Sequence, residues 1–336
     1  MILDIEHLHG GDLRISSFNA DGSVDLRVYS VPRCEDWAIC GDLDPKRSRE
    51  FVNWDGRPVK KVPSRFLNKF SVQEFIENLQ GEDKARLTAL HFPKVQSIDI
   101  ETEVIDGFPE PSVAKERITC IAISFEDRRT LVMGWKKLDH EQLEKVYNGH
   151  REYLKKFGDW DLKYKCFGSE HEMLFALVNH VLPKCSLVIG WNLDDFDWPY
   201  IVNRCKRLGI AISDASPVRK SAYKTEYPLH VGVIDYMKVY KRWDMTVKIK
   251  ESNALGFVSN AVLGVTKLKY DGSLQEMYDL HYDQYVLYNA IDSALVCLIH
   301  QKLRTVDASF SVAAMCNLSI YKASSPVALT EALLWK

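Results

Sequence analysis

The fold of this chain is set by one stretch, residues 95–104, which reads VQSIDIETEV. Successive side chains of a strand point to opposite faces. We therefore expect Ile98 and Ile100 to enter a core while Asp99 and Glu101 project together from the other face. Two carboxylates side by side repel each other unless a cation lies between them. The stretch predicts a buried strand that carries two acids toward a cation or, as is commoner for this pattern alone, toward solvent.

A second acidic segment follows another apolar strand. Residues 186–191 predict a short buried strand, and residues 192–197 (NLDDFD) form a turn before a helix predicted over residues 199–208. The end of a strand before a helix is where active sites on sheets tend to be built. The first two aspartates of the turn suit charges at a helix start, so Asp197 is the better ligand candidate.

The third acidic segment is YNAID, residues 288–292, inside a long helix predicted over residues 284–304. The i, i+4 spacing stacks the Tyr288 phenol and the Asp292 carboxylate on one helix face. By itself this motif equally suits a half-exposed aspartate beside a packed tyrosine. Together, the three segments suit a two-metal phosphodiesterase, because carboxylates are the ligands that hard divalent cations prefer.

The remaining pattern predicts a mixed sheet flanked by helices, an α/β fold. Residues 118–135 form a hairpin that turns at 126–128, and residues 230–235 form another strand. A capping box at residues 169–172 begins a helix over 173–182 that Pro183 ends. A smaller α+β module of about 90 residues precedes this one. It has a hairpin over residues 13–31 and a helix begun by a capping box at 71–74.

Composition argues against a DNA-coating protein, a zinc protein, a secreted protein and a membrane-spanning protein. Lys and Arg number 44 against 46 Asp and Glu, a net charge of −2, so the chain has no global basic field for coating DNA. Its eight cysteines include no C-x-x-C pair, so a zinc site is not expected and reduced thiols are. The first residues lack the apolar core of a signal peptide, and no apolar run approaches membrane-spanning length. We expect the protein to lie in a cytosol, either of a bacterium or of an infected cell.

Residues 217–250 are locally basic. They contain eight lysines and arginines against three acids, interleaved with aromatic residues. This pattern predicts a path for single-stranded nucleic acid. A solvated lysine face is an equally good interpretation of each individual residue.

The three acidic segments resemble, in order and rough spacing, the three exonuclease motifs of family B DNA polymerases. Tyr288 places the set in the DEDDy type, and the likeness is strongest to replicative polymerases of T-even-type phages. Residues 106–111, 233–236 and 266–272 are also similar to stretches of those enzymes. The resemblance implies an RNase H-like 3′→5′ exonuclease domain over residues 94–310. It further implies an N-terminal domain over 1–93 and, over 311–336, a return segment and helix that lead toward the palm.

The resemblance also implies a role for each matched residue. Tyr288 would orient the attacking water, Lys267 would face the scissile phosphate with Lys269 as its alternative, and Phe108 would stack on the terminal base. The alternative interpretation of Phe108 is a loop aromatic whose ring is buried in a core. The implied ligands of two Mg²⁺ ions, which Mn²⁺ can replace, are Asp99, Glu101, Asp197 and Asp292. The expected DNA-binding residues are Phe108, Asn192, Arg219, Lys220 and Lys269.

The chain departs from whole polymerases in one respect. It has neither a D-x-x-S-L-Y-P-S nor a D-T-D-S segment, which supply the carboxylates of the polymerase site. We therefore expect a proofreading exonuclease that is split or truncated before the palm and cannot synthesise DNA alone. Its expected partners are single-stranded or frayed primer–template DNA, a polypeptide carrying palm, fingers and thumb, and a sliding clamp through that polypeptide. The expected location is the cytoplasm of an infected bacterial host.

Two other functions stay open at this point. One is a free-standing DEDD nuclease that acts on RNA or in repair. The other is a non-catalytic scaffold subunit with a degenerate site. The complete set of four acids and Tyr288 weighs against a scaffold, since a scaffold has no chemical use for it.

Overall fold

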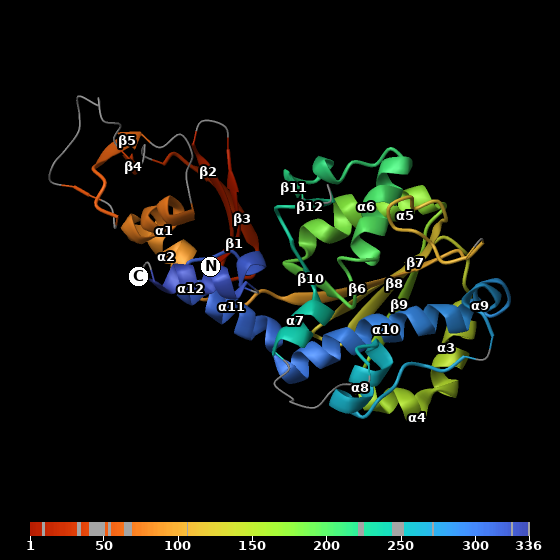
Figure 1. The fold of residues 1–336 in the computed structure, drawn as a ribbon. Helices are drawn as coiled ribbons and strands as arrows, with labels where there is room; N and C mark the ends of the chain where they lie inside the picture. Colours follow the sequence, from red (N-terminus) through yellow and green to blue (C-terminus); the bar gives the residue numbers. More distant parts are fainter. Residues whose placement is uncertain are drawn as a thin grey trace. The chain divides into compact units, whose positions relative to one another are not determined.

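The computed structural model groups the chain into two compact units, which are described separately (Figure 1). The first unit comprises residues 1–17, 26–89 and 313–336, and the second comprises residues 18–25 and 90–312. The structure describes residues 1–8, 11–31, 35–39, 51–52, 55–63, 69–105, 107–220, 225–243, 252–270, 272–323 and 325–334. The side chains of residues 35–38, 61–63 and 69–71 lie outside this description.

The first unit contains a three-stranded sheet whose order is β1-β2-β3. Its elements are β1 (Ile2–His7), β2 (Leu13–Phe18), β3 (Val24–Tyr29), the pair β4 (Glu35–Ile39) and β5 (Val59–Pro63), α1 (Lys69–Asn78), α2 (Gly81–Thr88) and α12 (Pro326–Leu334). The hairpin expected over residues 13–31 is confirmed. The capping box at Ser71 is wrong, because α1 has already begun by Lys69. Ile2, Leu13 and Ile15 pack on Val72 and Ile76 of α1, which joins the sheet to the helices.

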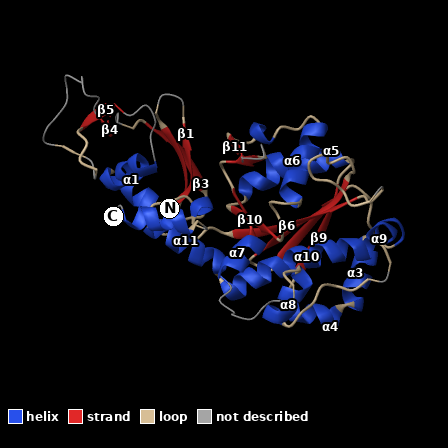
Figure 2. Ribbon diagram, viewed as in Figure 1, coloured by secondary structure: helices blue, strands red, loops and turns tan. Residues whose placement is uncertain are grey.

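The second unit contains a six-stranded sheet in the order β13-β10-β6-β7-β8-β9 (Figure 2). Its strands are β6 (Val95–Thr102), β7 (Ile118–Phe125), β8 (Arg129–Gly134), β9 (Asp161–Cys166), β10 (Leu187–Gly190) and β13 (Gly232–Asp235). β7 pairs in antiparallel fashion with both β6 and β8, whereas β10 pairs in parallel with both β6 and β13. The expected mixed sheet is confirmed.

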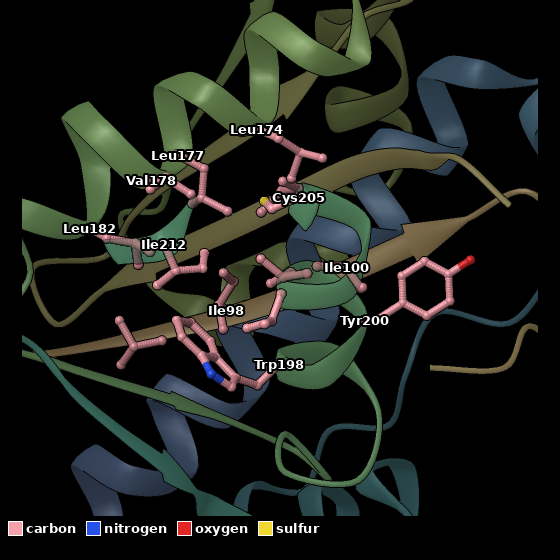
Figure 3. Close-up of a cluster of buried hydrophobic side chains, with 14 of the residues drawn as sticks. Ile98, Ile100, Leu174, Leu177, Val178, Leu182, Trp198, Tyr200, Cys205 and Ile212 are labelled. Carbon is pink, nitrogen blue, oxygen red and sulfur yellow. The ribbon is translucent and has the colours of Figure 1, made fainter. Parts of the chain in front are cut away.

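Helices cover both faces of this sheet (Figure 1). The helices of this unit are α3 (His140–Gly149), α4 (Arg151–Leu154), α5 (Glu170–Ala176), α6 (Asp197–Arg207), α7 (Tyr236–Trp243), α8 (Leu255–Leu263), α9 (Leu274–Leu280) and α10 (Tyr282–Leu303). α11 (Thr305–Met315) begins in this unit and ends in the first. α10 lies along one face, and α5 and α6 pack on the other. Figure 3 shows Ile98 and Ile100 of β6 in that second layer, among Leu174 and Leu177 of the α5 segment and Trp198 of α6. The expected inward direction of both isoleucines is confirmed.

Three expected helix boundaries differ from the structure. Ser169 caps α5 as expected, accepting the N–H of Glu172 over 3.2 Å. The helix then passes into a π-helical segment, Leu177–Val181, and a 3₁₀ turn that contains Pro183. α6 begins at Asp197 and not at Pro199, because a proline in the first helical turn lacks only an N–H that would have no partner inside the helix. α10 begins two residues before the predicted start.

Among the helices that the structure describes, none combines the length and the apolar character needed to cross a bilayer.

Candidate active site

The first two candidate ligands stand on the face of β6 opposite the isoleucine layer. Strand alternation turns Asp99 and Glu101 toward α10. The strand register fixes this orientation, because β6 pairs with β10 on one side and with β7 on the other. A slip of one residue would place two carboxylates in the apolar layer and two isoleucines in the site. The local fold and the chemistry of the site therefore depend on the same alternation.

The long helix α10 completes this side of the site. Ligand atoms of Asp99, Glu101 and Asp292 all lie within 4.8 Å of one another. Asn289, which is fully buried, donates from Nδ2 to Oδ2 of Asp99 over 2.8 Å. One turn further along, Ser293 Oγ donates to the carbonyl of Ser97 over 3.0 Å. These side chains lock the helix to the strand at the level of the acids.

Asp197 arrives from a tight turn at the end of β10. A Cβ on Gly190 would lie 2.9 Å from the carbonyl oxygen of Ile98, so only glycine allows the strand to end so close to β6. Asn192 follows in the left-handed region, with φ of 64°, and its carbonyl accepts the N–H of Asp195 and Phe196. Asparagine is among the few non-glycine residues that tolerate this conformation. The turn thereby starts α6 at Asp197.

The buried Asp197 carboxylate reaches β6 directly. Its Oδ1 accepts the backbone N–H of Ile100 over 3.0 Å, which places it beside the two acids of the strand. It is not part of the group of three carboxylates that lie within 4.8 Å of one another. The structure thus brings all four expected acids to one site, with three of them in a tight cluster.

Asp235 and Lys238 brace the acidic turn. Asp235 ends β13 directly beside Gly190 in the parallel register, and its Oδ2 accepts the N–H of Asp194 over 3.3 Å. Lys238 Nζ lies 3.3 Å from Asp194 Oδ2, 3.1 Å from Asp195 Oδ1 and 3.7 Å from Asp235 Oδ2. Asp194 and Asp195 are therefore bound to this brace and do not point at the cluster of carboxylates.

Lys267 is the cation that the structure places against the cluster. Its Nζ forms an ion pair with Oδ2 of Asp292 and lies 5.3 Å from the centre of the Tyr288 ring. Lys269, the alternative considered from the sequence, is exposed. Burial lowers the pKa of Lys267, but the charge of Asp292 and its hydrogen bond to Lys267 outweigh burial and raise the pKa above its ordinary value. Lys267 is therefore positively charged.

The carboxylates lie in an environment that disfavours their negative charge. Burial raises the pKa of Asp99 well above its usual range, and the neighbouring acids raise it further. Burial raises the pKa of Glu101 to about 8. It raises the pKa of Asp197 to about 7, opposed by the hydrogen bond from Ile100. Burial also raises the pKa of Asp292, against the lowering effect of Lys267. Four acids with one lysine make a site short of positive charge.

The donor set fits divalent metal ions. Oδ1 of Asp292 and Oδ1 of Asn289 are buried and, among the described residues, have no hydrogen-bond partner. Orphaned acceptors beside a cluster of carboxylates are costly unless a cation satisfies them. All the candidate donors are oxygen atoms, which suit Mg²⁺ or Mn²⁺ and not a thiolate-seeking metal.

Phe108 lies next to the acidic turn. Its side chain is 84% exposed, and its ring centre lies 5.3 Å from that of Phe196, one residue before Asp197. An aromatic that plugs a core would be buried, so that interpretation is wrong. Exposed aromatic faces are what nucleic-acid bases stack on.

The described basic residues of the segment 217–250 are largely engaged. Lys220 lies 3.4 Å from Glu226, and Arg219 stacks over Tyr227 at 4.8 Å. Both lie in the short strand β11 (Val218–Lys220), which pairs with β12 (Glu226–Pro228). Residues 221–224 and 244–250, which hold several of the counted cations, lie outside the described residues. The single-strand path and the DNA contacts of Asn192, Arg219, Lys220 and Lys269 stay predictions.

Three residues of the site were not identified from the sequence: Asn289, Asp235 and Lys238. Asn289 precedes Asp292 by three positions, so the helical period already placed both on one face. Asp235 ends an apolar strand, which is the position that singled out the acidic turn after β10. For Lys238 the local sequence signals only Asp235, three residues earlier, because Asp194 and Asp195 come from a segment that only the sheet brings near it.

The chain has a known family. The model of the family described as "DNA polymerase family B, exonuclease domain" matches residues 64–242, which is more than half of the chain and includes β6, β10 and α6. This chain belongs to the family B DNA polymerase exonuclease domains. The resemblance to family B DNA polymerases is thereby confirmed; the match contains the first two acidic segments and ends before the third, residues 288–292.

Similar proteins include polymerases of phages and archaea. The "DNA-directed DNA polymerase" of Escherichia phage RB69 is 28% identical over 264 residues, 72% of this chain and 29% of the relative. The enzyme of the same name from Enterobacteria phage T4 is 26% identical, over 73% of this chain and 29% of the relative. "DNA polymerase 1" of Sulfolobus acidocaldarius is 24% identical over 75% of this chain. The chain spans less than a third of the length of these relatives.

Proposed function

We propose that this exonuclease domain hydrolyses phosphodiester bonds at the 3′ end of DNA, one nucleotide at a time, and acts in proofreading. One observation carries the proposal: the cluster of half-buried Asp99 and Glu101 with buried Asp292, beside Tyr288 and Lys267. A cluster of acids with one lysine has no structural purpose in a sheet core, since unpaired charge there destabilises the fold. The family gives it a chemical purpose.

Two divalent ions, Mg²⁺ or Mn²⁺, would be held by Asp99, Glu101, Asp197 and Asp292. When bound, such ions lower the pKa of a water and stabilise the leaving oxygen. Asn289 fixes the direction of the Asp99 carboxylate through the hydrogen bond from Nδ2. Asp197 is oriented in the same way by the N–H of Ile100. The protein's own part is thus to hold four carboxylates in fixed rotamers.

Tyr288 and Lys267 act on the other reacting groups. Burial raises the pKa of Tyr288 to about 12, so its phenol stays protonated and donates a hydrogen bond that orients the attacking water. Lys267 carries its charge next to Asp292, where it neutralises a non-bridging oxygen of the scissile phosphate. Phe108 stacks on the terminal base, a contact that tolerates every base.

The preferred substrate is an unpaired 3′ end. A terminal nucleotide must leave its stack to reach the cluster of carboxylates, and a frayed or single-stranded end avoids that cost of roughly a few kcal/mol. The natural substrate on this proposal is a mismatched primer end on template DNA.

The test is a cleavage assay on DNA labelled at its 5′ end, with Mg²⁺, with Mn²⁺ and with a chelator. A ladder that shortens from the 3′ end only with metal, faster on single strands and mismatched ends than on matched duplex, supports the proposal. Equal cleavage rates on matched and frayed ends would contradict the mechanism. Preferential cleavage of RNA would favour the free-standing nuclease, and no cleavage of either would favour the scaffold.

The relatives are DNA polymerases, which supports a polymerase context for this activity. We propose that a portion carrying palm, fingers and thumb docks against α12 in the cytoplasm of an infected bacterium. A sliding clamp would bind through that portion. Val327 is 65% exposed, Leu333 55% and Leu334 80%, so α12 presents apolar side chains that such a portion would cover. Trp335, expected to join them, lies outside the described residues. The domain boundaries 1–93, 94–310 and 311–336 are part of this proposal.

Leu333→Asp tests the docking. Charge placed in a desolvated contact should weaken association with a separately expressed palm–fingers–thumb polypeptide in light scattering, while cleavage of single strands stays unchanged. No association of the unaltered chain at micromolar concentration would overturn the docking.

A further inference from the structure

The segment that carries Lys267 has no regular structure of its own. Residues 264–270 form neither helix nor strand, so no ladder of backbone hydrogen bonds fixes them. One side chain reaches this backbone from far away in the sequence. The Tyr153 hydroxyl, on α4, donates to the carbonyl oxygen of Thr266 over 2.6 Å. The hydrogen bond lies one peptide unit away from the residue that faces the carboxylates.

Tyr153 is itself held firmly. Its ring packs against Phe157 with centres 5.5 Å apart, and Phe157 stacks on Trp160 at 5.4 Å. Phe157 and Trp160 are both buried. Burial raises the pKa of Tyr153 above its ordinary value, and the charge of Asp292 raises it further. The phenol therefore keeps its proton and can donate to a carbonyl, which can only accept.

The side chain of Lys267 is confined from another direction. A Cβ on Gly256, in α8, would lie 3.2 Å from Cγ of Lys267, so the lysine stem passes closely over the glycine. Its head ends on Asp292. The backbone before Lys267, its stem and its ammonium group are thus all held by contacts, and the contact to the backbone is made by Tyr153.

We propose that Tyr153 is a positioning residue for Lys267 in the hydrolysis of the phosphodiester bond. The inference rests on the function proposed above. Tyr153 does not touch the reacting atoms. It holds Thr266 in one conformation, so the ammonium group of Lys267 stays next to the cluster of carboxylates before the reaction begins. A charge that is already in place lowers the activation barrier because the loop need not rearrange.

The test compares two tyrosines of one aromatic cluster. Tyr153→Phe removes the hydroxyl that bonds Thr266. Tyr147→Phe is the matched control, because its hydroxyl also donates to a backbone carbonyl, that of Trp160, over 2.8 Å. Its ring belongs to the same cluster, with its centre 6.0 Å from that of Trp160. Tyr153→Phe should lower kcat on single-stranded DNA about three- to tenfold, the rate equivalent of one lost hydrogen bond, at unchanged KM. Tyr147→Phe should leave kcat unchanged.

A double-mutant cycle identifies the route of the effect. In a Lys267→Met background, Tyr153→Phe should cause no further loss of kcat, because its only route to the reaction has been removed. If Tyr153 had a merely structural role, Tyr153→Phe would lower kcat by the same factor in both backgrounds, and that result would overturn the inference.

Hydrogen exchange separates this inference from the proposed function. In metal-free protein, amides of residues 264–270 should exchange faster in Tyr153→Phe than in Tyr147→Phe, whether or not the chain cleaves DNA. An unaltered chain without nuclease activity would reject the proposed function and leave the exchange result to decide on the anchor. An active chain whose two variants match in both kcat and exchange would reject the anchor alone.

Discussion

Asn289 joins α10 to β6 through the hydrogen bond from its Nδ2 to Oδ2 of Asp99 over 2.8 Å. The same amide also approaches the Asp99 carbonyl oxygen, at 3.3 Å. The contact spans 190 positions of the sequence and fixes which way the first carboxylate faces. Partners that orient a ligand in this way contribute to metal affinity without touching the metal.

Asn289→Ala should therefore weaken Mn²⁺ binding, by roughly ten- to a hundredfold, with the fold retained. Binding is measured by titration calorimetry at constant pH. Ser293→Ala is the matched control: it removes a hydrogen bond between the same helix and strand, but from a serine that touches no carboxylate. Equal losses of affinity in both variants would mean that Asn289 acts only through the packing of α10.

Asp99→Ala should abolish cleavage and leave the protein folded. It removes one proposed ligand and also relieves repulsion within the cluster of carboxylates. Cleavage of labelled single strands measures the first effect, and thermal unfolding of the metal-free protein measures the second. Unchanged turnover in a folded variant would show that the reaction uses other carboxylates.

The stability of the metal-free protein should fall as pH rises from about 4 to about 8. The folded pKa of Glu101 is raised from 4.5 to about 8 and that of Asp197 from 3.8 to about 7. The folded state then binds protons that the unfolded state releases, so ∂ΔG/∂pH of unfolding is negative between the two values. Glu101→Gln removes one such group and should flatten the decline. Its melting temperature in chelator should exceed that of the unaltered protein at pH 8 and approach it near pH 4. Parallel curves would contradict this assignment.

Tyr288→Phe should be milder than loss of a carboxylate. The ring keeps its place beside Lys267, and only the hydroxyl that orients water is lost, so kcat should drop about tenfold. A loss as complete as that of Asp99→Ala would show that the phenol does more than orient the water. The comparison requires both variants at saturating metal, so that a difference in affinity does not enter the rates.

A stability prediction concerns the helix layer away from the cluster of carboxylates. Arg204 of α6 makes two hydrogen bonds of 2.7 Å to the carboxylate of Glu170 of α5, and both side chains are buried. Arg204→Met leaves the Glu170 charge without its partner and should reduce the free energy of unfolding by about 3–5 kcal/mol. Arg129→Met breaks the exposed pair with Asp127 and should cost far less, because solvent screens that pair. Urea unfolding of both variants makes the comparison, and similar losses would show that the buried pair is not special.

The sequence alone determined the elements whose side chains repeat with a period. Alternation along residues 95–104 placed Ile98 and Ile100 in the core and turned Asp99 and Glu101 to the other face, because a strand has only two faces. The helical period placed Tyr288 and Asp292 on one side of α10. The Ser169 cap was predictable because its partner lies three residues away.

Tertiary structure decided what no period governs. The sequence already favoured Asp197, but only the turn after Gly190 and the contacts of Lys238 show how Asp194 and Asp195 are held elsewhere. The choice of Lys267 over Lys269 depended on where an irregular segment runs, and Tyr153 holds that segment from α4. In a loop, the direction of each side chain is set by contacts distant in the sequence, so local pattern carries no information about it.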